Sequence, residues 1–170
     1  MPLPDTIGLK AGTPKVWAPA GGDHLFTITS LANGAAWQGV KGDLGANWAR
    51  MYNVHVETAV ATAAIDGNPV EFFWCSSTSA TANLANPGGL SGADATVANI
   101  AAVKRQLTYI GSLWLGNALG TVVQQQRFPF FPATRYGFPV AVNGSGGVAL
   151  SATAANHKFT ITPAMDEVIE

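Results

Sequence analysis

The stretch 51–60, Met-Tyr-Asn-Val-His-Val-Glu-Thr-Ala-Val, decides the fold class of this chain. Its large apolar residues stand at alternate positions, at Tyr52, Val54 and Val56, and polar residues stand between them. A period of two is typical of a β-strand that buries one face and exposes the other to water. The stretch therefore predicts a half-buried strand.

The same period recurs along the chain in short β-branched and aromatic runs that Gly, Asn and Pro separate. Besides 51–60, we expect strands over residues 25–30, 70–75, 107–115, 122–128, 138–142 and 158–162. About seven or eight strands in 170 residues need two packed layers, because one sheet would leave an apolar face uncovered. The prediction is an all-β protein, an antiparallel β-sandwich or jelly roll.

Two of these runs predict how the faces are buried. Residues 70–75 are apolar on both faces apart from Glu71, so this strand should lie centrally in a sheet or under another layer. In 107–115 the alternation predicts one face that carries Leu107, Tyr109, Leu113 and Leu115.

The segments outside the strands are an arm and a long loop. Residues 1–22 are rich in Pro and Gly and predict an extended arm, followed by a single domain over 23–170. The segment 76–103 alternates poorly, and its end, 95–103, predicts one short helix capped by Asp94. A loop of this length is usually functional or ordered by a partner.

Composition excludes several kinds of partner. Charged residues make up 11% of the chain, against about 25% in an average soluble domain, and the net charge is -1, so copies should associate readily. The nine basic residues are scattered, which argues against nucleic acid. No apolar stretch is long enough for a membrane span, and the N-terminus lacks the pattern of a signal peptide. We expect synthesis and folding in a reducing cytoplasm, with the lone Cys75 packed as a core thiol.

A catalytic site or metal centre is not predicted. His55 and Glu57 share a strand face as in cupins, but the second histidine of a cupin cluster is missing, so we expect a solvated strand face. Ser145 lacks the glycine that a nucleophile elbow needs two residues before the serine, and its stretch predicts a flexible hairpin turn. The Gly-rich stretch 87–92 lacks the lysine of a phosphate-binding loop, and the few carboxylates are widely separated. We therefore expect no enzyme activity and no cofactor.

A resemblance to a known protein family makes the expected function more specific. Residues 70–168 resemble a family of small structural proteins encoded near the capsid genes of tailed bacteriophages. The resemblance is carried by the stretches 72–74 (FFW), 86–94 (NPGGLSGAD), 106–111 (QLTYIG), 135–140 (RYGFPV) and 161–163 (ITP), with Asp166 and Glu167. It implies a capsid cement or decoration protein with a jelly-roll fold. Such a protein would form a homotrimer on the outer surface of the virion and would bind and reinforce the shell of the major capsid protein.

The arm, the long loop and the phenylalanine-rich stretch 128–131 are the expected contact regions. The candidate interface residues are Pro14, Val16, Trp17, Pro19, Asn86, Leu90, Phe128, Phe130, Phe131, Arg135 and Tyr136. The alternative is a carbohydrate-binding or receptor-binding sandwich on a phage particle, in which exposed aromatic residues such as Trp37 and Trp48 would stack on sugar rings.

Overall fold

A computed structural model describes residues 6–64, 67–116 and 122–169 of the chain. Its strands are β1 (Thr6–Ala11), β2 (Lys15–Ala18), β3 (His24–Leu25), β4 (Ala36–Gln38), β5 (Gly42–Asp43), β6 (Met51–Thr58), β7 (Pro69–Ser77), β8 (Ala95–Thr96), β9 (Thr108–Trp114), β10 (Gln124–Phe130), β11 (Tyr136–Asn143) and β12 (Lys158–Ile169). Its helical turns are α1 (Ile100–Val103) and the 3₁₀ turns η1 (Pro87–Gly89), η2 (Lys104–Gln106) and η3 (Ala154–Asn156).

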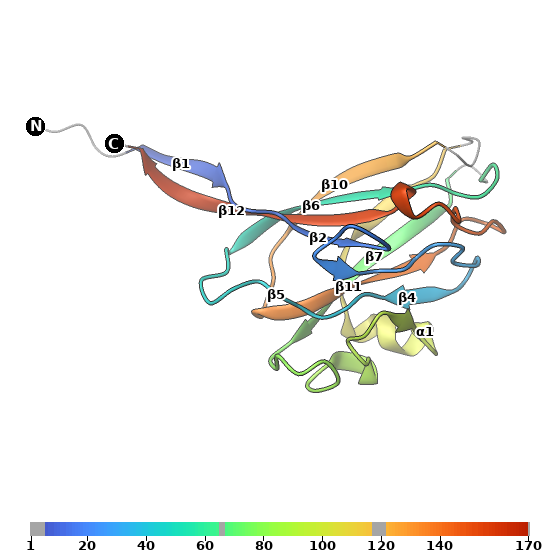
Figure 1. The fold of residues 1–170 in the computed structure, drawn as a ribbon, viewed down its shortest axis with the longest axis horizontal. Coiled ribbons are helices and arrows are strands. Elements are labelled where there is room, and N and C mark those ends of the chain that lie inside the picture. The colour runs from blue at the N-terminus through green and yellow to red at the C-terminus, as the bar shows by residue number, and fades with distance from the viewer. Residues whose placement is uncertain (1–5, 65–66, 117–121, 170) are drawn as a thin grey trace, which may run out of the picture.

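The strands form two packed sheets, which confirms the predicted all-β sandwich (Figure 1). The first sheet has the order β10-β6-β12-β2-β3, and β1 pairs with the far part of β12. The second sheet has the order β8-β4-β11-β7-β9, and β5 pairs with β11. All pairs are antiparallel except β2 with β3. The short strands β4, β5 and β8 are absent from the sequence prediction, because runs of two or three residues show no periodicity.

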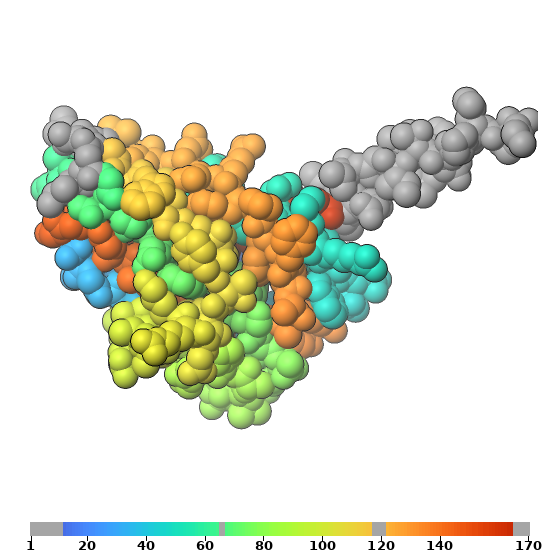
Figure 2. Space-filling model, turned by 180° about the vertical axis from the view of Figure 1, so that it is seen from behind, coloured from blue at the N-terminus to red at the C-terminus, as the bar shows by residue number. Residues whose placement is uncertain are grey.

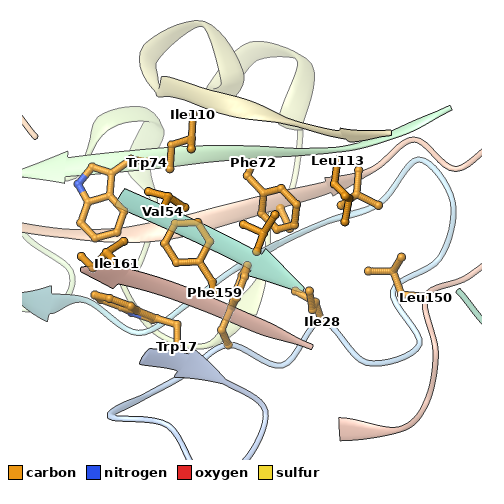
Figure 3. Packing of buried hydrophobic residues seen from close by; sticks show 14 of the residues in the cluster. Trp17, Ile28, Val54, Phe72, Trp74, Ile110, Leu113, Leu150, Phe159 and Ile161 are labelled. Atoms are coloured by element: carbon orange, nitrogen blue, oxygen red, sulfur yellow. The ribbon is translucent and has the colours of Figure 1, made fainter. Parts of the chain in front are cut away.

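The main core fills the space between the two sheets, and aliphatic side chains surround a group of aromatic rings in it (Figure 3). The Trp17 ring meets that of Trp74 edge to face with centroids 5.5 Å apart, and Phe159 lies within 6.3 Å of both. Edge-to-face and offset pairs are the favourable geometries for aromatic rings. As the alternation in 51–60 predicts, Val54 and Val56 of β6 are completely buried in this core.

The outer face of the second sheet carries a second, smaller core. Phe73 and Cys75 of β7 lie on this face and pack with Leu90 and Val103 from the loop and helix layer over the sheet. Strand β7 therefore has a neighbouring strand on each side and a packed layer on each face, as its apolar sequence predicts. Burial raises the pKa of the Cys75 thiol to about 12, and the prediction of a packed core thiol is confirmed.

A β-bulge overturns the predicted facing of residues 107–115. Phe72 pairs with Gly111 but the next residue, Phe73, pairs with Tyr109, so Ile110 is the extra residue in β9. An extra residue shifts the alternation by one position. Tyr109 consequently points to solvent, whereas Ile110 and Leu113 enter the core.

The predicted helix cap is also wrong. Helix α1 spans only Ile100–Val103, and the residue before it is Asn99 in a left-handed conformation. The Asp94 carboxylate instead accepts hydrogen bonds from the backbone N–H of Thr27 at 2.7 Å and from Nε1 of Trp37 at 2.6 Å. Asp94 therefore ties the long loop to the body of the sandwich.

The predicted arm of residues 1–22 divides into two parts. Lys15–Ala18 form β2 within the first sheet, so the domain begins before the expected boundary at residue 23. Strand β1 pairs along Ala164–Ile169 of β12, from Thr6 opposite Ile169 to Ala11 opposite Ala164. This two-stranded ribbon, built from both ends of the chain, projects away from the sandwich (Figure 1).

Candidate functional site

Three of the predicted contact residues lie in the interior. Trp17 is completely buried, Phe130 packs against Trp74 with ring centroids 5.4 Å apart, and Leu90 belongs to the second core cluster. Their side chains fill the domain and leave no apolar surface for a partner. Both rings face inward, because Trp17 lies opposite the buried Phe159 of β12 and Phe130 lies opposite the buried Tyr52 of β6.

The remaining residues of the arm and the loop lie nearer the surface. Pro14 is exposed, and Val16 and Pro19 are half-buried. The side-chain amide of Asn86, also half-buried, donates hydrogen bonds to the carbonyl oxygens of Ala82 and Leu90 at 2.6 and 2.7 Å. Asn86 therefore fixes the shape of the loop.

Arg135 and Tyr136 form a polar cluster with Asp43. The Arg135 guanidinium donates two hydrogen bonds to the Asp43 carboxylate, from Nε and Nη2, both at 2.6 Å, and it lies 5.0 Å from the centre of the Tyr136 ring. These bonds hold the pKa of the Asp43 carboxyl below its ordinary value. The pair joins β5 to the start of β11 and remains partly exposed.

The most apolar part of the described surface lies along β9 and β10. Of the eight large apolar side chains exposed among the described residues, five lie within 109–131: Tyr109, Trp114, Val122, Val123 and Phe131. Of these five residues, only Phe131 is among the interface residues predicted from the sequence. Trp114 is 58% exposed and Phe131 is 64% exposed. We call these five residues the edge surface.

The edge surface lies where the open edges of the two sheets meet. Strand β9 ends the second sheet and β10 ends the first, and the backbone N–H of Gly116 donates to Oε1 of Gln124 at 2.8 Å between them. Figure 2 shows the yellow residues of β9 beside the orange residues of β10 on this side of the molecule. Phe128 is half-buried here, and its ring lies directly on Gly111. The bulge in β9, which no local pattern reveals, is the reason that sequence reasoning missed Tyr109.

The outer face of the first sheet is polar and carries a shallow hollow of about 380 Å³. It is lined by Asn53, Val54, His55, Arg127, Thr160 and Thr162, and we call it the sheet hollow. His55 Nε2 is 2.9 Å from Oε1 of Gln125, and the Glu57 carboxylate is 3.3 Å from Nζ of Lys158. His55 and Glu57 thus lie on a solvated strand face.

The other residues considered for catalysis are held by local structure. The Ser145 hydroxyl donates to the carbonyl oxygen of Val148 at 2.5 Å, and its backbone N–H donates to Oδ1 of Asn143 at 3.0 Å, so it belongs to a tight turn. Within 6–64, 67–116 and 122–169, no three His, Cys, Asp or Glu residues gather as metal ligands would. In the same ranges no helix has the length and apolarity needed to cross a membrane.

Comparison with known proteins does not place the chain in a family. No protein-family model matches its sequence, and a search of curated proteins finds no significant relative.

Proposed function

We propose that this chain is a non-enzymatic virion structural protein of a tailed bacteriophage. As a cement or decoration protein, it binds the major capsid shell from outside and stabilises it through contacts between copies in a homotrimer. It is made and assembled in the host cytoplasm and ends on the outer capsid surface. The observation that carries this proposal is the projecting ribbon of β1 and β12.

The ribbon supports an assembly role because an isolated two-stranded sheet is marginally stable in water. Its outer backbone edges can pair with a strand of a neighbouring molecule, which is a common way of extending a sheet between chains. In the first sheet β1 pairs with β12 along the part of β12 that projects from the sandwich. This leaves the ribbon in a position to make contacts between molecules.

The edge surface and the low charge of the chain support the same proposal. Five large apolar side chains stand near the open edges of both sheets, and charged residues make up only 11% of the sequence. Exposed apolar clusters of this kind commonly mark surfaces that another protein covers. A weakly charged domain also meets little electrostatic repulsion from neighbouring copies.

Deletion of residues 1–11 tests this proposal. The deleted protein should keep the far-ultraviolet circular dichroism of a β-sandwich and lose binding to purified phage shells that lack the protein, measured by co-sedimentation. A second variant keeps the chain length and replaces residues 6–11 by a Gly-Ser segment. It should also fail to bind, which would show that the sequence of β1 is needed and not only its length. Full shell occupancy by either variant would contradict a role of the ribbon in capsid binding.

The alternative function, a carbohydrate-binding or receptor-binding module, is favoured by one feature. Trp114 and Tyr109 present exposed aromatic rings, 58% and 54% accessible, that can stack on sugars. Trp37 is less suited to this role, because its Nε1 is bound to Asp94 and its ring is half-buried, whereas Trp48 is exposed. Substitution Trp114→Ala should remove a glycan-array signal if stacking carries the binding, and an array without any signal for the native protein would dismiss this alternative.

A further inference from the structure

The sheet hollow gathers side chains from three adjacent strands of the first sheet. Arg127 of β10 lies opposite His55 of β6, and His55 lies opposite Thr160 of β12, so these three form one row across the sheet. Asn53 and Thr162 form the next row. Strands β10, β6 and β12 lie side by side in Figure 1, and their inward residues fill the core, so both rows face outward.

The charge in the hollow favours an anionic ligand. Arg127 is the one residue of fixed charge in the lining, and no carboxylate lines the hollow. The neighbouring carboxylate on β6, Glu57, is paired with Lys158 at 3.3 Å. Arg127 is exposed, and its guanidinium forms no ion pair with a carboxylate of the described residues. A planar guanidinium fork fits a carboxylate with two parallel hydrogen bonds.

The other lining groups suit a ligand rich in hydroxyl groups. The Asn53 amide and the Thr160 and Thr162 hydroxyls can each donate and accept hydrogen bonds. No Trp, Tyr or Phe ring is among the lining residues, so charge and hydrogen bonds are the main interactions that the hollow offers a ligand. The volume of about 380 Å³ falls in the range of pockets that hold small molecules, about 300 to 1,000 Å³.

We propose that the sheet hollow binds one acidic sugar unit, with the sugar carboxylate on Arg127 and the sugar hydroxyls on Asn53, Thr160 and Thr162. None of its lining residues belongs to the edge surface or to the paired stretches 6–11 and 164–169 of the ribbon, so binding to the hollow can be measured apart from capsid binding. A protein that carries this site on an exposed sheet face would attach to acidic polysaccharide.

Titration of the full chain with glucuronic acid, glucose and inorganic phosphate, followed by backbone amide NMR, tests the proposal. Glucuronic acid should give saturable shifts centred on Asn53, Arg127, Thr160 and Thr162. Glucose lacks the carboxylate and phosphate lacks the ring hydroxyls, so each should bind at least tenfold more weakly. Absence of a saturable response to glucuronic acid would overturn the proposal. Equal affinity for phosphate would show a general anion site and would overturn it as well.

Single substitutions test whether glucuronic acid binds in the sheet hollow. Arg127→Gln should weaken binding of glucuronic acid at least tenfold, and Thr160→Val, which keeps the shape, should weaken it severalfold. Arg105→Gln is the matched control, because Arg105 is an exposed arginine in η2, in the layer over the second sheet. Trp114→Ala should also bind normally. Wild-type affinity in Arg127→Gln, or loss of binding in Trp114→Ala, would place the ligand elsewhere, whatever the outcome of the shell-binding assay.

Discussion

Gly111 lies on β9 at the edge of the second sheet, and the Phe128 ring of β10 covers it. A Cβ atom at residue 111 would collide with that ring. We expect Gly111→Ala to push Phe128 off the core and to lower the free energy of unfolding by about 1–3 kcal/mol, the usual cost of overpacking. Chemical denaturation measures this difference.

Gly116→Ala is the matched control for this prediction. Its nearest contact would be Oε1 of Gln124 at 3.8 Å, an ordinary van der Waals distance. This variant should change stability by less than about 0.5 kcal/mol. Equal effects of the two substitutions would show that Phe128 does not close the sandwich at this edge.

His157 makes the fold sensitive to acid. Its side chain is 1% exposed, with Nε2 2.8 Å from the carbonyl oxygen of Ser151 and Nδ1 2.7 Å from Oγ1 of Thr58. The carbonyl can only accept, so Nε2 carries the proton and neutral Nδ1 accepts from the threonine hydroxyl. Burial lowers the pKa of His157 below its ordinary value of 6.5.

The sign of the pH effect follows from that shift. Below pH 6.5 the unfolded chain takes up a proton that folded His157 does not, so stability is complete above this pH and falls as the pH decreases. The expected loss is up to about 1.4 kcal/mol per pH unit. Burial also lowers the pKa of His24, which adds to the effect.

Denaturation midpoints at about pH 7.5 and 5.5 measure this dependence. The change between the two pH values should be smaller in His157→Gln than in the native protein and smallest in the double variant with His24→Gln. An unchanged slope in the double variant would contradict the assignment.

At the scale of elements, Lys41 organises the long loop after β7. Its Nζ contacts Oγ of Ser77 at 2.9 Å and the carbonyl oxygens of Ser79, Thr81 and Leu84 at 3.1, 2.7 and 2.9 Å. One ammonium group thus gathers three loop carbonyls. We expect Lys41→Met to release residues 78–85, with a cost of about 1–3 kcal/mol for the unmade hydrogen bonds.

Hydrogen exchange measures this release, as faster exchange of the amides in 78–85. The matched control is Lys104→Met, which removes a partly exposed ion pair with Glu71 at 2.6 Å and should cost less than about 1 kcal/mol. Unchanged exchange in Lys41→Met would show that the loop holds its shape without the lysine.

The pattern of apolar and polar residues along the sequence predicts some elements of this fold, but it misses those that depend on residues far away in the chain. Strands β6 and β7 follow from the sequence because burial sets the periodicity of 51–60 and the apolar run of 70–75. The bulge at Ile110 depends on pairing with β7, and the role of Asp94 depends on Thr27, which is 67 residues away. The ribbon joins the two ends of the chain, so no local signal identifies it.

The candidate site was predicted less well than the fold. A hydrophobic residue can fill the core or meet a partner, and only the tertiary structure distinguishes the two. Trp17 and Phe130 proved to be core residues, whereas Phe131, one position further along the chain, is exposed. The sheet hollow depends on the register of three strands that are distant in sequence.

At the scale of the whole molecule, the edge surface predicts self-association. Burying Trp114 and Val122 between copies would stabilise an oligomer by about 25 cal/mol per Å² of apolar surface. We expect the native protein to sediment as a trimer and the double variant Trp114→Ser, Val122→Ser to dissociate. Leu84→Ser is the control, since Leu84 is equally exposed but lies on the loop after β7, and it should remain trimeric. A native monomer would contradict the predicted oligomer.

Cryo-electron microscopy of the native phage particle tests directly whether this β-sandwich coats a capsid. We expect density of the sandwich on the outer surface of the shell at junctions of the major capsid protein, with the ribbon of β1 and β12 reaching a neighbouring molecule. A shell without this density, or the sandwich located only in the tail, would contradict it.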